Sequence, residues 1–174
     1  MKKFHPSDLV CLENLIGKSI SDIFYQPVSG ILAYVDMFVV NFGDKREVSL
    51  HVFSFFRVVN SNILLTASDC FFDSNYERLT PEEEENERSN LYEKTLLHSN
   101  IEHVKDKLKN AKVLKAYATD IGDVIIEFDN DIKMEIIIDA LCNQECYRLI
   151  TNNGKSSHHN VVTCNKGQLF YYTE

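Results

Sequence analysis

Residues 37–53 read MFVVNFGDKREVSLHVF, two runs of branched and aromatic side chains joined by a short polar turn. In the second run, every other residue from Val48 to Val52 is apolar. This period of two is typical of a β-strand with one buried face, because successive side chains of a strand point to opposite faces. Gly43 opens the turn, where a flexible residue is favoured. The sequence therefore predicts a β-hairpin with arms over residues 31–42 and 47–56.

A segment of the same character occurs in the second half of the chain. Residues 38–44 align with residues 124–130, apolar position with apolar position and turn with turn. Each segment is preceded by an amphipathic pattern, over residues 9–16 and 97–108, that is typical of a helix. We therefore expect an α+β fold of two tandem helix-plus-antiparallel-sheet units, an αβββ-like pseudo-repeat related by a pseudo-two-fold axis.

These patterns divide the chain into three parts. Residues 1–79 are expected to form the first α+β half, residues 80–98 an acidic helical linker, and residues 99–174 the second half. The alternative is that the two halves merge into one compact domain. The pattern that opens at Ser99, SNIE, is a capping box and predicts the start of the second helix.

Composition and charge exclude several classes of function. The chain has 174 residues and a formal net charge of −8, without a basic stripe, so direct nucleic-acid binding is not expected. The longest apolar runs, residues 35–42 and 136–142, are shorter than the roughly 20 residues that cross a bilayer. The first residues lack the apolar stretch of a secretion signal. We expect a cytoplasmic protein with reduced cysteines and no membrane span.

One cluster of residue types is a candidate metal site, because thiolates and imidazoles are the preferred ligands of zinc. Its members are Cys142, Cys146, His158, His159 and Cys164. Their spacing lacks the close ligand pairs at both ends that structural zinc sites show. Buried core cysteines and a polar turn are the favoured interpretation, so no metal and no cofactor are expected.

No catalytic motif is recognisable in the sequence. Residues 156–159, SSHH, place hydroxyl groups beside imidazoles, but an exposed loop explains this adjacency. Arg57 and Arg148 each follow the predicted strands of their own half. We expect them to bind carboxylates at the ends of the sheets rather than a substrate.

Two groups of acidic residues are the candidate partner-binding surfaces. The first is the run Glu82, Glu83, Glu84, Glu85 and Glu87, which a solvated helix N-terminus also explains. The second group, which a pair of polar turns also explains, is Asp120, Asp123, Asp129 and Asp131. Carboxylates would speed the encounter with a basic protein, which makes such a partner the expected one.

In its general format the chain resembles the immunity proteins of bacterial toxin systems. The resemblance lies in a short acidic chain whose residues 17–20, GKSI, and 38–50 alternate apolar and polar side chains. It implies a stoichiometric inhibitor that plugs the active cleft of a toxin, often by offering carboxylates to a basic nuclease. It matches no diagnostic residue and transfers no binding site.

The leading hypothesis from the sequence is thus a cytoplasmic protein-binding module, of immunity type if the resemblance holds. One alternative is a small-ligand protein or zinc-binding enzyme with a groove between the two halves. Another is a structural protein whose exposed sheet face forms a homodimer or larger homo-oligomer.

Overall fold

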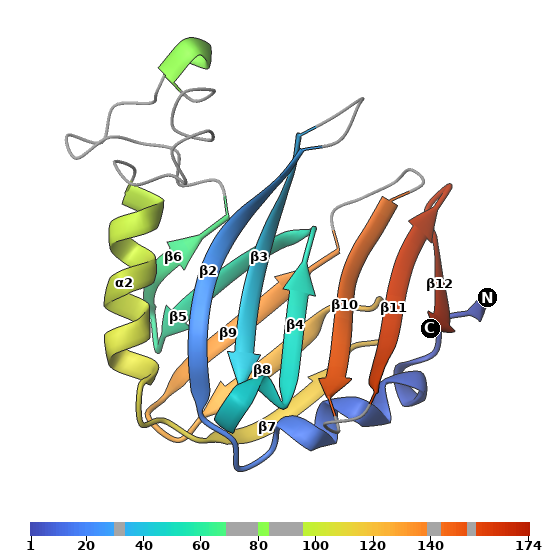
Figure 1. The fold of residues 1–174 in the computed structure, drawn as a ribbon, viewed down its shortest axis with the longest axis horizontal. Coiled ribbons are helices and arrows are strands. Elements are labelled where there is room, and N and C mark those ends of the chain that lie inside the picture. The colour runs from blue at the N-terminus through green and yellow to red at the C-terminus, as the bar shows by residue number, and fades with distance from the viewer. Residues whose placement is uncertain (30–33, 69–79, 84–95, 139–143, 153–155) are drawn as a thin grey trace.

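The computed structural model describes residues 1–29, 34–68, 80–83, 96–138, 144–152 and 156–174 (Figure 1). These residues form two antiparallel sheets with few helices. The predicted α+β repeat is therefore wrong. A period of two in the sequence shows that a strand is half-buried, but it does not say which sheet the strand joins.

The larger sheet has seven strands in the order β1-β12-β11-β10-β4-β3-β2. Their bounds are β1 Lys2–Lys3, β2 Ile20–Ser29, β3 Tyr34–Phe42, β4 Val48–Val52, β10 Gln144–Asn152, β11 Ser157–Asn165 and β12 Gln168–Thr173. The predicted hairpin is present as β3 and β4, with the short 3-10 helix η2 (Asp44–Arg46) in its turn. Its second arm is shorter than expected, because the chain leaves this sheet after Val52.

The smaller sheet has five strands in the order β6-β5-β9-β8-β7. Their bounds are β5 Phe55–Asn60, β6 Ile63–Ala67, β7 Val113–Ala118, β8 Val124–Phe128 and β9 Ile132–Ile137. Both sheets thus combine strands from before and after residues 80–98. The segments over 38–44 and 124–130, aligned as a repeat, begin in β3 and β8 of different sheets and are not equivalent.

The crossing from the larger to the smaller sheet is short and fixed by hydrogen bonds. Between β4 and β5, the backbone N–H groups of Phe53 and Ser54 donate to the Cys146 carbonyl at 2.9 and 3.0 Å. The buried Ser54 hydroxyl donates to the same oxygen at 2.9 Å. Cys146 itself occupies a β-bulge of β10, where an extra residue bends the strand. The bulge thus presents the carbonyl that turns the chain from one sheet into the other.

Two helices close the space between the sheets. The α-helix α2 (Leu96–Leu108) contacts β2 and β6, and the 3-10 helix η1 (Pro6–Leu15) packs against β7 (Figure 1). The apolar stripe predicted for the second helix is correct, because Leu97, Ile101, Val104 and Leu108 are all buried. The predicted N-cap is wrong, since Ser99 lies inside α2 and its hydroxyl donates to the Leu96 carbonyl.

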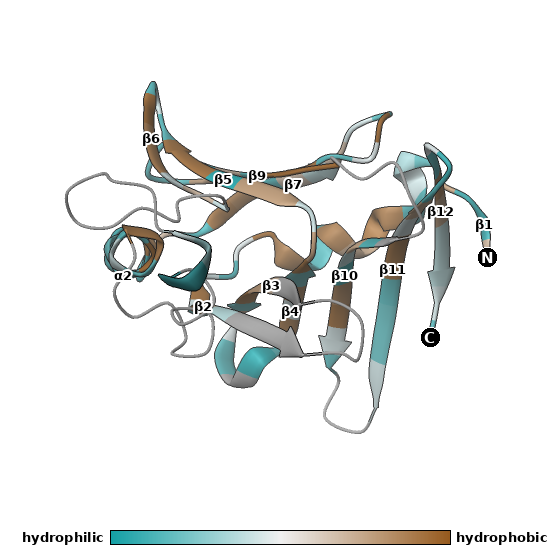
Figure 2. Cartoon of the chain, turned by 90° about the horizontal axis from the view of Figure 1, so that it is seen from above, coloured by the Kyte–Doolittle hydropathy of each residue, from teal (hydrophilic) through white to brown (hydrophobic). Residues whose placement is uncertain are grey.

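The core lies between the two sheets (Figure 2). Phe38 of β3 and Phe56 of β5 stack across the interface with their ring centroids 3.7 Å apart and their planes at 6°. At another point the Tyr147 hydroxyl of β10 donates at 2.8 Å to the carbonyl of Gly122, in the turn before β8. Aromatic packing and a buried hydrogen bond therefore both join the larger sheet to the smaller one.

Candidate functional site

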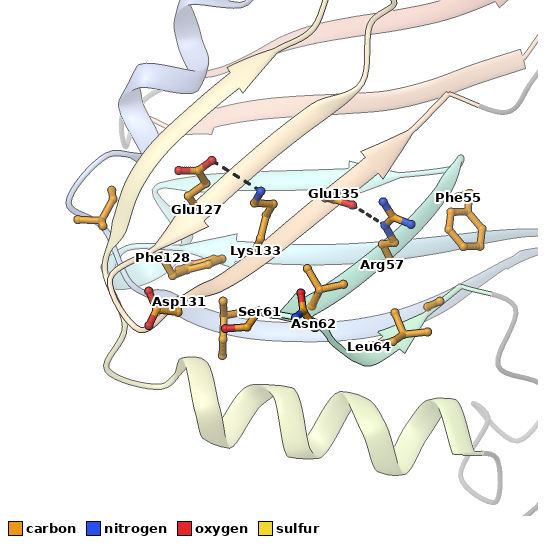
Figure 3. Close-up of a pocket in the computed structure, with 14 residues that line it drawn as sticks. Phe55, Arg57, Ser61, Asn62, Leu64, Glu127, Phe128, Asp131, Lys133 and Glu135 are labelled. Carbon is orange, nitrogen blue, oxygen red and sulfur yellow. Dashed lines mark hydrogen bonds and ion pairs between the residues drawn. The ribbon is translucent and has the colours of Figure 1, made fainter.

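A large hollow lies on the outer face of the five-stranded sheet, the face turned away from the core (Figure 3). Along β5, Phe56 and Val58 are fully buried, whereas Phe55, Arg57 and Val59 line the hollow. This alternation is the period of two expected of a strand. The volume of the hollow is about 980 Å³, and we call it the five-strand hollow.

The curvature of the sheet follows from a β-bulge at each edge. In β6 the pairing with β5 shifts between Val58 and Val59, so that Leu65 is an extra residue. In β7 the pairing with β8 shifts between Val113 and Lys115, so that Leu114 is the extra residue. Bulges bend a strand and increase its twist, which curls the two edges of a sheet. Figure 2 shows the sheet nearly edge-on, with β6 bending away at one end.

Exposed apolar side chains mark the two edges of the five-strand hollow. Leu64 on β6 has 57% of its surface exposed and Leu114 on β7 has 56%, and both line the hollow. They lie on opposite edge strands, four strand spacings apart, a width of about 19 Å. This surface was not predicted from the sequence, because periodicity does not say which face of a strand is covered by the rest of the fold. The sequence signal for an exposed apolar side chain was the run of residues 63–65, Ile-Leu-Leu. Three successive apolar residues of a strand cannot all point to the same buried face.

Paired charges cross the floor between these edges. Arg57 of β5 forms an ion pair with Glu135 of β9. On the neighbouring strands, Lys133 and Lys115 lie 3.9 and 3.6 Å from the Glu127 carboxylate. Exposed pairs of this kind stabilise a fold by roughly 0–1 kcal/mol each, so the ladder is not needed for stability. The charged residues that line the hollow are two cations, Arg57 and Lys133, and three carboxylates, Glu127, Asp131 and Glu135, so the surface has little net charge.

The four candidate aspartates lie in different environments. Asp131 lines the five-strand hollow, and Asp120 is exposed in the turn between β7 and β8. The carboxylates of Asp123 and Asp129 accept backbone hydrogen bonds from Ile138 at 2.8 Å and Lys112 at 3.0 Å. Partner binding by these aspartates stays a prediction, with Asp131 the best placed.

Within the acidic run, only Glu82 and Glu83 belong to the described residues. Glu82 is exposed, and the Glu83 carboxylate accepts hydrogen bonds from the backbone N–H and hydroxyl of Thr80 at 2.8 and 2.7 Å. The Glu83 backbone N–H donates in return to the Thr80 hydroxyl at 3.3 Å, and such reciprocal bonds are typical of a helix N-terminus. Glu84, Glu85 and Glu87 lie outside the described residues, and their part in binding stays a prediction.

The candidate metal ligands are not brought together where they are described. Cys146 and Cys164 are buried in the core between the sheets, whereas His159 lies on the opposite, outer face of the seven-stranded sheet. His158 is exposed on β11, and Cys142 lies outside the described residues. Within the described part of the chain, no group of three or more metal-binding side chains is found.

Both arginines bind carboxylates, as predicted, but they lie within strands β5 and β10 of different sheets rather than at the ends of the sheets. Arg148 forms two parallel hydrogen bonds to Glu145, both at 2.9 Å, on the outer face of the seven-stranded sheet. Its remaining nitrogen lies 3.0 Å from Nδ1 of His159. Because a guanidinium can only donate, this contact makes Nδ1 an acceptor and leaves the ring proton on Nε2. Nε2 of the same ring lies 3.3 Å from the Ser157 hydroxyl.

His51 of β4 belongs to the same outer face and has an altered pKa. Burial, and next the positive charge of Arg148, hold the pKa of His51 below its ordinary value. The negative charge of Glu145 opposes this shift. The folded protein therefore favours a neutral His51 imidazole.

A stability measurement checks this shift. Because the pKa of His51 is lower in the folded than in the unfolded chain, the unfolded state binds more protons between those two values. The stabilisation is complete above about pH 6.5 and is lost as the pH falls through the folded pKa. We expect the free energy of unfolding of wild type to fall more than that of His51→Gln between about pH 7.5 and about pH 5. Parallel curves from urea denaturation would contradict the assignment.

The fold defines a class of protein, a two-sheet antiparallel β protein with a hollowed outer face. Comparison with protein-family models, with curated proteins and with solved structures finds no match. In the described ranges, no helix is both long and apolar enough to span a membrane. Function is therefore inferred from the surface of this chain alone.

Proposed function

We propose that this chain is a protein-binding module whose docking surface is the five-strand hollow. The observation that carries the proposal is the pair of exposed leucines, Leu64 and Leu114, at opposite edges of the hollow. Large exposed apolar side chains that border a common surface are typical of interaction sites. A docked partner would remove both from water.

The size of the surface favours a protein over a small molecule. The five-strand hollow is about 980 Å³ in volume, at the upper end of the roughly 300–1,000 Å³ of small-molecule pockets. The edge strands that carry the leucines are four strand spacings apart, about 19 Å measured along the sheet, and a helix with its side chains is about 10–12 Å wide. A helix or a strand pair of a partner therefore fits between the two edges. The aromatic ring of Phe55 adds apolar area to the floor.

Charge favours a partner other than a second copy of this chain. Two copies, each with a net charge of −8, repel one another on approach, whereas a neutral or basic protein is not repelled. The ion pairs Arg57–Glu135 and Lys133–Glu127 lie between the edge strands. Their side chains can separate and form hydrogen bonds to polar groups at the rim of a partner. We therefore commit to a neutral or basic protein with apolar side chains at its contact surface. The immunity-type role stays a prediction from the sequence.

Affinity capture with matched baits tests this proposal. Wild type, Leu114→Asp and Ile121→Asp would be used in equal amounts on an extract of the native cell. Ile121 is 70% exposed in the turn between β7 and β8 and does not line the five-strand hollow. We expect one stoichiometric partner with wild type and with Ile121→Asp, and its loss with Leu114→Asp.

Two outcomes would contradict the proposal. Equal capture by Leu114→Asp and wild type would place the partner elsewhere on the chain. A mass in solution that doubles with concentration for wild type but not for Leu114→Asp would assign the five-strand hollow to a second copy of the chain.

A further inference from the structure

A second, smaller hollow lies on the outer face of the seven-stranded sheet. An inference about this hollow does not depend on the function proposed for the five-strand hollow. It has a volume of about 370 Å³ and is bordered by residues of β2, β3, β4, β10 and β11. We call it the seven-strand hollow. Its volume is within the range of roughly 300–1,000 Å³ that small-molecule pockets occupy.

One side chain in its wall has an unsatisfied hydrogen-bond donor. Asn41 of β3 is 2% exposed, and its Oδ1 accepts a hydrogen bond of 2.6 Å from the Ser49 hydroxyl on β4. The amide nitrogen Nδ2 of the same side chain is buried and has no partner. A buried donor without an acceptor destabilises the fold, which makes Asn41 an unusual residue for a purely structural position. A ligand that supplies an acceptor to Nδ2 would recover this free energy.

The polar groups around Asn41 are donors and cations. Arg46, in the turn before β4, lines the hollow together with the imidazoles of His51 and His159. Of the described residues that line it, none is acidic, although the whole chain carries a charge of −8. The nearby carboxylates of Glu145 and Glu174 face Arg148, at 2.9 and 3.4 Å. The described lining of the seven-strand hollow therefore carries one fixed cation, Arg46, and several hydrogen-bond donors, and it has no carboxylate of its own.

The remaining wall is apolar. Phe24 of β2, Val39 of β3 and Ile150 of β10 contribute side chains to the hollow. Val39 is 3% exposed although it lies on the outer face. A purely inorganic ion would gain nothing from this part of the wall, whereas an organic group would bury apolar surface there.

We infer that the seven-strand hollow binds a small organic anion, with a carboxylate or phosphate group received by Asn41, His51 and Arg46 and an apolar portion against Phe24, Val39 and Ile150. The anion supplies the acceptor that Nδ2 of Asn41 lacks. It also favours protonation of His51, which strengthens the contact because a hydrogen bond between charged groups is about twice as strong as a neutral one. Small-molecule sites commonly combine an apolar wall with a few placed polar groups in this way.

Titration of the isotope-labelled full chain, followed by NMR, tests the inference. The probes are phenyl phosphate, benzoate and the neutral benzyl alcohol, each added at constant ionic strength. We expect saturable shifts of the His51 and His159 ring signals with at least one of the two anions and a much weaker response to benzyl alcohol. The tighter of the two anions identifies the preferred charged group.

Variants separate the seven-strand hollow from non-specific charge effects. Asn41→Ala should weaken anion binding about tenfold, since a hydrogen bond to a charged group is lost. Arg46→Gln changes an exposed side chain, so it tests the site even if Asn41→Ala folds poorly. Arg57→Gln, which removes an arginine from the five-strand hollow, is the matched control and should bind the anion as wild type does.

Three results would overturn the inference. The first is the absence of saturation with both anions, and the second is equal affinity for benzyl alcohol and the anions. The third is an equal loss of binding in Arg46→Gln and Arg57→Gln, which would indicate that net charge alone attracts the probe.

Discussion

Phe56→Ala is expected to lower the free energy of unfolding by about 3–5 kcal/mol, the usual cost of truncating a buried aromatic side chain. Phe56 is fully buried on β5 and stacks on Phe38 of β3, with 3.7 Å between the ring centroids. The ring of Tyr25 on β2 packs against both phenylalanines. One substitution therefore removes contacts that hold the two sheets together, and the resulting cavity lies where neither sheet can close it alone.

The measurement is thermal and urea unfolding of both proteins. For a chain of this size each kcal/mol lowers the midpoint temperature by roughly 2–4 °C, so a decrease of about 6–20 °C is expected. Phe55→Ala is the matched control, because the same residue type is removed at the next position of the same strand. Phe55 lines the five-strand hollow and is only half-buried, so its loss should cost about 1 kcal/mol or less. Equal destabilisation by the two variants would contradict the assignment of the two faces of β5.

The second large effect concerns binding. Once the captured partner is purified, the double variant Leu64→Asp, Leu114→Asp should weaken its binding at least about hundredfold, because burying each leucine is worth about 1.5–3 kcal/mol. Each new carboxylate must also lose water in the complex, which adds to the cost. Both leucines are more than half exposed, so the free energy of unfolding should change little.

Isothermal titration calorimetry supplies the dissociation constants for this comparison. Ile63→Asp is the control, because Ile63 precedes Leu64 on β6, is 66% exposed and does not line the five-strand hollow. We expect Ile63→Asp to bind the partner within a few-fold of wild type. If Ile63→Asp weakens binding as much as Leu64→Asp, the added negative charge is responsible rather than the lost apolar contact.

Much of the local structure could be predicted from the sequence. The hairpin around Gly43, the hairpin of β8 and β9 and the apolar stripe of α2 all follow from side-chain periodicity and turn residues. These features form between residues that are close in the sequence, and therefore the order of apolar and polar residues is enough to predict them. That Arg57 and Arg148 bind carboxylates was also predicted. Which carboxylates they bind, Glu135 and Glu145, was not.

The candidate sites could be predicted only in small part. Asp131 was selected for its charge and does line the five-strand hollow, but Leu64 and Leu114 were overlooked. Leu114 is the extra residue of the β-bulge in β7 and Leu64 precedes that of β6, and a bulge is a feature of strand pairing rather than of the strand itself. Asn41 was likewise overlooked, because its missing partner becomes visible only when Ser49 is placed beside it.

By itself the sequence determined that this chain forms half-buried antiparallel strands around an apolar core and that it has a net charge of −8. The tertiary structure alone decided which strands share a sheet, so that Arg57 meets Glu135 and Phe38 meets Phe56. The physical reason is that a period of two specifies only that one face of a strand is buried. Strand order, bulges and the hollows they produce arise from pairing between distant segments, and their free energy depends on the whole assembled fold.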